Sequence, residues 1–126
     1  MQRRRVILAN RPRLVRELLA NAIRKRAGLR LVAEVTDLTR LPSAVELTEA
    51  DWIVISLPPG GEIPAVVISL LADHPSVSVL AVDAESNRAK VRCPSGRERA
   101  LEGLSLAGIL SVMHGWPDPA TSKHSP

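Results

Sequence analysis

Short apolar runs alternate with stretches of helical periodicity along most of this chain. The runs are rich in Val, Ile, Leu and Ala and are bounded by turn residues, which is typical of buried strands. They predict strands at residues 4–9, 29–35, 52–57 and 77–82. The stretches between and after them predict helices at residues 12–27, 37–47, 62–72 and 97–113. Asp37 suits the cap of the second helix, and His74 followed by Pro75 marks the end of the third.

The first helix has the most regular pattern. Pro12 suits the first position of a helix, and Gly28 suits its end. Between them, apolar residues recur at helical spacing and form one stripe: Leu14, Val15, Leu18, Leu19, Ala22 and Ile23. We expect this whole stripe to be buried against the sheet, with the charged residues facing away.

The connection after the fourth strand is too short to hold a helix. Only residues 83–88 separate that strand from a fifth β-like run at residues 89–93, whereas parallel strands need a connection of about a dozen residues or more. We therefore expect the fourth and fifth strands to form an antiparallel hairpin, or the fifth strand to be irregular. The remaining crossovers predict a three-layer α/β sheet of about five strands in the flavodoxin-like order 2-1-3-4-5.

The composition fits one folded domain. Hydrophobic residues make up 45% of the 126 residues, which argues against disorder. We expect a domain at residues 1–113 and a flexible tail at residues 114–126, where Trp116 either folds back onto the sheet or anchors a partner. The absence of Phe and Tyr argues against a stacking platform for single-stranded nucleic acid.

The sequence also limits the compartment and the bound groups. No apolar run approaches the roughly 20 residues of a membrane span, and residues 6–9 are too short a run for a signal peptide. The single cysteine, Cys93, excludes an internal disulfide. We expect a cytoplasmic protein without a membrane contact, a cofactor or a metal site, because the histidines are dispersed: His74, His114 and His124.

The charge is distributed unevenly along the chain. Residues 1–30 carry ten of the 17 basic side chains and one acid, a net charge of +9, while the rest of the chain carries −5. A basic pole of this kind can steer an acidic partner, and the alternative interpretation is a solvated helix face. Nucleic-acid binding is not expected, since no motif that reads DNA accompanies the basic residues.

Several segments share their order and spacing with a known family. They are residues 6–19, 31–35, 51–61, 74–75 and 79–82. In this arrangement the chain resembles the receiver domain of two-component response regulators, particularly those attached to LuxR-type DNA-binding domains. The resemblance is continuous over about residues 4–82 and implies a receiver-like fold and a role in signal transduction.

Every position that the resemblance links to chemistry departs from the family's pattern. Asn10 and Arg11 stand where it implies the acidic pair that holds Mg²⁺, and Arg11 repels a cation. Ser56 stands at the position of the phosphate-accepting aspartate, and its hydroxyl is a poor nucleophile without a base. Asp83 stands at the position of the switch Ser or Thr. We therefore expect a degenerate pseudo-receiver that is neither phosphorylated nor an enzyme.

The absent fourth helix is a further departure from the family. The family commonly uses the surface around its fourth helix, fifth strand and fifth helix for dimerisation and output. Loss of that helix is expected to uncover apolar sheet surface, which the tail, a partner or a second copy must then cover. We therefore expect a module that binds a signalling or regulatory protein and forms a homodimer.

Two alternatives remain open at this point. Cys93 and Arg99 have the Cys-x5-Arg spacing of cysteine-dependent phosphatases between a predicted strand and helix, but Ala100 follows where that family usually has Ser or Thr. Arg11 and Arg13 lie after the first strand, where with Ser56 they can form a site for an anion or a small acidic ligand.

Overall fold

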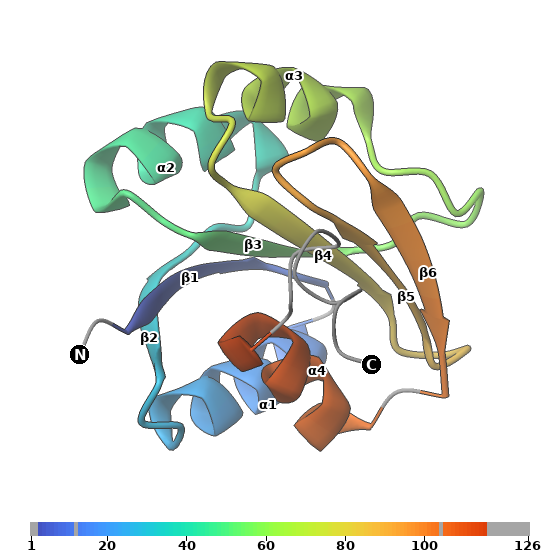
Figure 1. Ribbon diagram of the computed structural model, residues 1–126. Coiled ribbons are helices and arrows are strands. Elements are labelled where there is room, and N and C mark those ends of the chain that lie inside the picture. Colours follow the sequence, from blue (N-terminus) through green and yellow to red (C-terminus); the bar gives the residue numbers. More distant parts are fainter. Residues whose placement is uncertain (1–2, 12, 104, 116–126) are drawn as a thin grey trace, which may run out of the picture.

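The computed structural model describes residues 3–11, 13–103 and 105–115 (Figure 1). The elements in chain order are β1 (Arg4–Ala9), α1 (Arg13–Arg24), β2 (Leu29–Glu34), the 3₁₀ turn η1 (Leu38–Arg40), α2 (Leu41–Thr48), β3 (Trp52–Ser56), α3 (Ala65–Asp73), β4 (Ser78–Asp83), β5 (Arg88–Arg92), β6 (Glu98–Glu102) and α4 (Leu106–Gly115). Within these ranges, no helix has the length and apolar character that crossing a membrane requires. Pro12, Trp116 and His124 lie outside the described residues.

One mixed sheet runs through the molecule in the order β2-β1-β3-β4-β5-β6. The first four strands in this order are parallel to one another, and β5 and β6 are antiparallel to their neighbours. The hairpin between β4 and β5 was predicted from the short connection, and it is confirmed. The expected number of five strands is wrong, and the order 2-1-3-4-5 is therefore incomplete.

Helices cover both faces of the sheet and make three layers. In Figure 1, α1 and α4 lie below the sheet, and α2 and α3 lie above it. Because successive strand residues point to opposite faces, Val6 and Leu8 pack toward α1 and α4, whereas Ile7 and Ala9 pack toward α2 and α3. The predicted α/β class with its aliphatic core is confirmed.

The predicted helix at residues 97–113 is wrong in its first part. The chain turns back after Cys93, whose N–H donates to the Arg97 carbonyl oxygen (2.9 Å), and then forms β6. Gly103, with φ +67, separates that strand from α4. The sequence of β6 has helical composition, but each of its residues pairs with β5, and such pairing between strands is invisible in a single segment.

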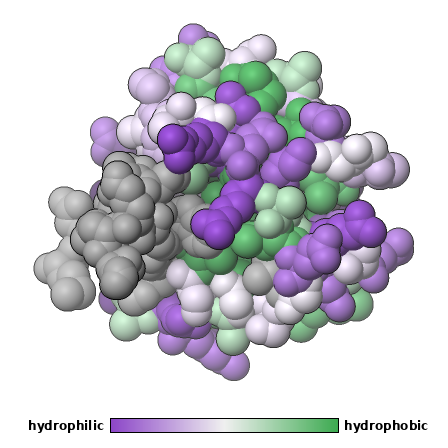
Figure 2. Space-filling view, turned by 45° about the vertical axis from the view of Figure 1, so that its right-hand side comes forward, coloured by the Kyte–Doolittle hydropathy of each residue, from purple (hydrophilic) through white to green (hydrophobic). Residues whose placement is uncertain are grey.

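The expected apolar sheet surface beside the absent helix is also wrong. On the α3 side of the sheet, β5 carries Arg88, Lys90 and Arg92, the cross-strand partners of Asp83, Ala81 and Val79 in β4. Glu98 in β6 forms ion pairs with Arg92 (2.6 Å) and Lys90 (3.5 Å). Figure 2, which turns this edge of the sheet forward, shows hydrophilic side chains among apolar ones on it. This face is charged and therefore needs no apolar cover.

The apolar stripe of α1 is only partly buried. Leu19, Ala20 and Ile23 face the core, but Leu14 is 67% exposed and Leu18 is 54% exposed. The burial of Ala20, which the predicted stripe lacks, shows that the helix is rotated relative to the expectation. Consequently, Leu14 and Leu18 lie on the solvent side of α1 rather than against the sheet.

The smaller details of the helices follow local signals in the sequence. Asp37 accepts a hydrogen bond from the Thr39 N–H, as expected of a cap, although it begins η1 and α2 follows with Pro42 in its first turn. His74 is the C-cap of α3, as predicted. The last helix extends beyond the expected boundary at Met113, as far as Gly115.

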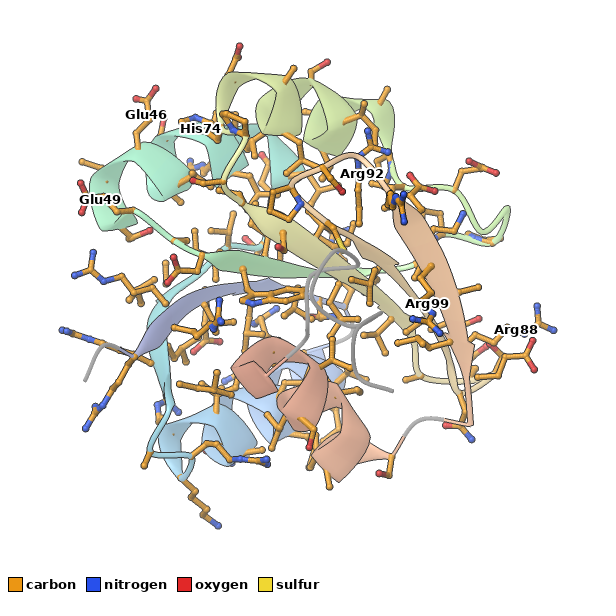
Figure 3. All side chains as sticks on the ribbon, viewed as in Figure 1. Glu46, Glu49, His74, Arg88, Arg92 and Arg99 are labelled. Atoms are coloured by element: carbon orange, nitrogen blue, oxygen red, sulfur yellow. The ribbon has the colours of Figure 1, made fainter. Side chains whose placement is uncertain are left out.

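We expect a glycine to stabilise one position of α2 and destabilise another. Glu49, the C-cap of α2, has φ 55 and ψ 46, a left-handed conformation that favours glycine. Glu46 lies within the helix. Figure 3 shows both side chains at the surface. Glu49→Gly should raise the free energy of unfolding by about 0.5–1 kcal/mol, and Glu46→Gly should lower it by about 1 kcal/mol. Urea unfolding of both variants checks this, and an equal loss in the two would contradict the left-handed cap.

Candidate functional site

The strand order changes direction between β1 and β3. The chain leaves β1 toward β2 on one side, and it leaves β3 toward β4 on the other. The carboxyl ends of these two neighbouring strands form the crevice where open α/β sheets bind ligands. Asn10 directly follows β1 and Ser56 is the last residue of β3, so both candidate residues lie at this switch point.

Two hydrogen bonds join the Ser56 side chain to the backbone of Arg11. The Arg11 N–H donates to Ser56 Oγ (2.8 Å), and the Ser56 hydroxyl donates to the Arg11 carbonyl oxygen (2.9 Å). These bonds hold the chain after β1 against the end of β3. A hydroxyl whose proton is held by a carbonyl oxygen, with no base beside it, is a structural group rather than a nucleophile.

Asn10 is the other group at the switch point, and it is 1% exposed. Its carbonyl oxygen accepts a hydrogen bond from Arg16 Nη1 (3.3 Å), but neither Nδ2 nor Oδ1 of its side chain has a partner among the described residues. A buried amide without partners typically costs about 1–3 kcal/mol of stability. The Asn10 side chain is therefore an uncompensated buried polar group, and as a neutral amide it supplies no charge for a cation.

The two candidate anion-binding arginines already have partners. Nη2 of Arg11 donates to the Thr36 carbonyl oxygen (2.8 Å). Nε of Arg13 forms an ion pair with Glu17 Oε2 (2.6 Å) one turn along α1. The structure thus brings Asn10 and Arg11 together with Ser56, while Arg13 belongs to the exposed surface of α1.

Asp83 stabilises the turn between β4 and β5. Its carboxylate accepts hydrogen bonds from the Ser86 hydroxyl (2.7 Å) and the Glu85 N–H (3.1 Å). The Ser86 hydrogen bond is the main cause that holds the pKa of Asp83 below its ordinary value; desolvation, the next largest effect, opposes it. The hydrogen bonds of this carboxylate therefore stabilise the β4–β5 hairpin and do not reach the switch point.

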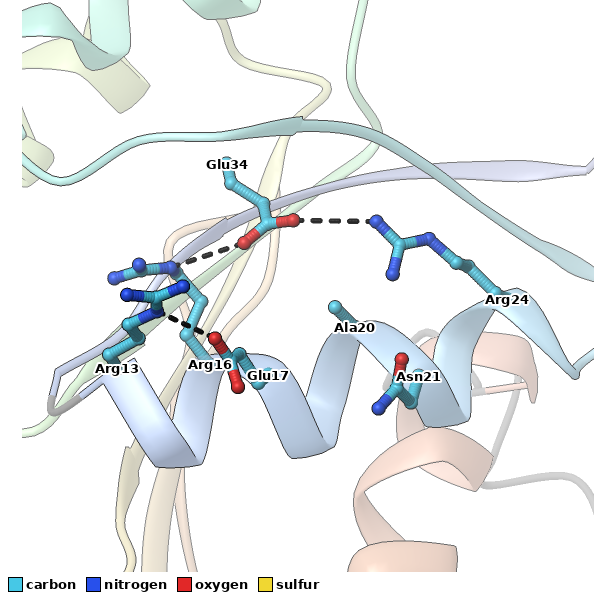
Figure 4. Close-up of a pocket in the computed structure, with 7 residues that line it drawn as sticks. All are labelled: Arg13, Arg16, Glu17, Ala20, Asn21, Arg24 and Glu34. Carbon is cyan, nitrogen blue, oxygen red and sulfur yellow. Dashed lines mark hydrogen bonds and ion pairs between the residues drawn. The ribbon is translucent and has the colours of Figure 1, made fainter.

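A polar groove of about 450 Å³ lies between α1 and β2 (Figure 4), and no pattern in the sequence predicted it. Figure 4 shows the Glu34 carboxylate between two guanidinium groups, those of Arg16 (3.2 Å) and Arg24 (3.5 Å). Arg13 and its partner Glu17 also line the groove. Because each of these three arginines faces a carboxylate, the groove does not offer the free cationic cluster that an anion requires.

An apolar groove of about 170 Å³ lies between α1, α4 and the β4–β5 turn. Most of its lining is aliphatic and includes Val15, Leu19 and Ile109. Leu18 and Leu106, the latter 42% exposed, form part of its lining, and Leu14 lies one turn from Leu18. We name Leu14, Leu18 and Leu106 the leucine face. Leu14 and Leu18 belong to the apolar stripe that the sequence predicted for α1, but that stripe was expected to be buried against the sheet.

The geometry around Cys93 differs from that which the phosphatase alternative requires. Cys93 is buried at the end of β5, and its loop leads into the antiparallel strand β6 rather than into a helix. Arg99 lies opposite Val91 within that sheet. The helix N-terminus that lowers a thiol pKa and binds phosphate in such enzymes is missing here.

Other chemistry is not visible in the described part of the chain. Within residues 3–11, 13–103 and 105–115, no three side chains among His, Cys, Asp and Glu are grouped so that they could hold a metal ion. Searches of family models, curated proteins and solved structures give no match to the chain. The site must therefore be interpreted from its own geometry.

We expect Asn10→Leu to stabilise the protein. Leucine has the same branched outline and the same number of side-chain heavy atoms as asparagine, and it lacks the unpartnered amide, so the substitution should raise the free energy of unfolding by about 1–3 kcal/mol. Asn10→Ala is the matched control, because it removes the same amide but leaves a cavity and should gain less. Chemical unfolding measures both, and a loss of stability in Asn10→Leu would show that the amide is satisfied in solution.

We expect Ser86→Ala to raise the pKa of Asp83 toward its ordinary value of 3.8. Because the pKa is lowered in the folded state, the contribution of Asp83 to stability is present above pH about 3.8 and is lost as the pH falls through the folded pKa. An NMR titration of the carboxyl groups measures this. Asp37, whose pKa Thr39 lowers, is the internal control; an unchanged Asp83 pKa would rule out the Ser86 hydrogen bond as the cause.

Proposed function

We propose that the chain is a non-catalytic, receiver-like regulatory module that acts by contact with another protein and without phosphorylation. The leucine face, which leaves three large aliphatic side chains exposed beside an apolar groove, is the observation that carries the contact. The hydrogen bonds of Ser56 are the main argument against catalysis.

The switch point supports the absence of chemistry. Ser56 uses its hydroxyl for two bonds to the Arg11 backbone. Asn10 contributes a neutral amide, and Arg11 contributes a cation, so neither residue offers the carboxylate oxygens that Mg²⁺ prefers. Asn10, Arg11 and Ser56 thus provide neither a carboxylate acceptor for a phosphoryl group nor a negatively charged ligand for a metal ion.

The leucine face supports a protein contact. Leu14 and Leu18 are more than half exposed, and Leu106 adds apolar surface from α4. Complete burial of a leucine side chain contributes about 1.5–3 kcal/mol, so covering the exposed parts of Leu14 and Leu18 contributes about half of that from each. Clustered apolar side chains around a groove commonly mark a protein-binding surface.

The anion-binding alternative has weaker support. Arg11 donates to a backbone carbonyl, and Arg13 is paired with Glu17. The polar groove holds Glu34 between its other two arginines. An acidic ligand would have to displace these carboxylates, whereas a protein partner gains from the leucine face without breaking any ion pair.

We expect binding of a protein partner to depend on the leucine face. Wild type, Leu18→Glu and Leu47→Glu serve as baits in nuclease-treated lysate of the native host, followed by mass spectrometry. Leu47 is 85% exposed on α2, on the opposite face of the sheet, and is therefore a matched control. A protein should be retained by wild type and Leu47→Glu and lost by Leu18→Glu. Equal retention by all three baits would contradict a contact through this face.

A further inference from the structure

We propose that the occupant of the leucine face is a second copy of this chain, with α1 of one copy antiparallel to α1 of the other. The inference rests on the proposed function, because it names the partner of that same face. Two observations carry it: the arrangement of charges beside the leucines, and the charges on the β6 edge of the sheet.

The exposed side of α1 carries two parallel rows of side chains. Leu14 and Leu18, one turn apart, make the apolar row, and Arg13 and Glu17, also one turn apart, make the charged row beside it. Leu19, Ala20 and Ile23 anchor the helix to the core on its other side. The rows are therefore presented on a helix that is held in place.

Two-fold symmetry makes both rows self-complementary. In an antiparallel pair related by a two-fold axis, the same flank of each helix meets the same flank of the other. When Leu14 of one copy packs against Leu18 of the second, the axis passes near the middle of this turn. Arg13 then faces Glu17 of the second copy, and Glu17 faces its Arg13. Each α1 thus offers both an apolar contact and an ion pair to its own duplicate.

The apolar groove extends the same contact. Leu18 forms part of its lining, together with Val15, Leu19 and Ile109. A Leu14 side chain of the second copy that contacts Leu18 therefore lies at the groove. Leu106, on the α4 side of it, widens the apolar area on the flank opposite to the charged row.

The edge strand β6 is one competing place for a second copy among the described residues, and its charges oppose such a contact. Antiparallel pairing of two β6 strands centred on Ala100 puts Glu98 of each copy opposite Glu102 of the other. Like charges directly opposite destabilise such a pair. Charged side chains are also a common protection of edge strands against pairing. The observations therefore favour α1 over the sheet edge.

The test is the oligomeric state of the purified full chain, measured by light scattering over a concentration series. Wild type and Leu47→Glu should be dimers with equal dissociation constants. Leu18→Glu should raise that constant by about 100-fold, because it removes two symmetric leucine contacts and buries a charge. Circular dichroism confirms that each variant is folded.

Charge reversal supplies the sharper part of the test. Arg13→Glu alone and Glu17→Arg alone each place like charges opposite each other and should weaken the dimer by about 10-fold. An equimolar mixture of these two variants should recover wild-type affinity as a heterodimer, since one copy then presents two acids and the other two bases. A parallel pair of α1 helices already places Arg13 opposite Arg13 and Glu17 opposite Glu17 in the wild type, so neither single variant should weaken it; the loss in both single variants therefore distinguishes the antiparallel pair.

The outcomes separate this inference from the proposed function. Loss in both single charge variants with recovery in the mixture, and with Leu47→Glu unaffected, supports the antiparallel dimer. A monomeric wild type at all concentrations, or a dimer that Leu18→Glu leaves intact, overturns it. The proposed function survives that result only if Leu18→Glu still loses a different protein from the lysate, and it fails as well if no such protein is found.

Discussion

The parallel ladder between β1 and β3 is the constraint on which the rest of the molecule depends. Val6, Ile7, Leu8, Ile53 and Val54 are all completely buried, because helices cover both faces of these strands. The Ser56–Arg11 hydrogen bonds continue this attachment beyond the strand ends. At the switch point, where a sheet of this kind usually binds ligands, the Ser56 side chain instead holds the segment after β1 against the end of β3.

Contrary to expectation, the absence of a helix between β4 and β5 does not leave an apolar sheet surface uncovered. Lys90, Arg92 and Glu98 replace an apolar surface with paired charges, so this side of the sheet is stable in water. The exposed leucines that cluster beside a groove lie instead on α1 and α4. This leucine face follows from the way α1 packs: Ala20 is buried toward the sheet, and Leu14 and Leu18 are turned outward.

Sequence patterns predicted the parts of the fold that depend on local signals. The apolar runs located the parallel strands, the short connection after Asp83 predicted the hairpin, and Asp37 and His74 marked helix ends. The missed parts depend on distant residues. The strand β6 is defined by its pairing with β5, and the Ser56–Arg11 contact joins residues 45 positions apart. The candidate residues Asn10, Arg11 and Ser56 do meet, but Asp83 and Arg13 serve local contacts.

The most direct measurement is methyl NMR of the leucine side chains over a dilution series of the full chain. The account predicts that the methyl resonances of Leu14, Leu18 and Leu106 shift with concentration, because these groups leave water when two copies meet. The methyl groups of Leu47, on the opposite face, should not change. Concentration-independent resonances on the leucine face, or shifts confined to Leu47 or to Leu101 in β6, would contradict the account.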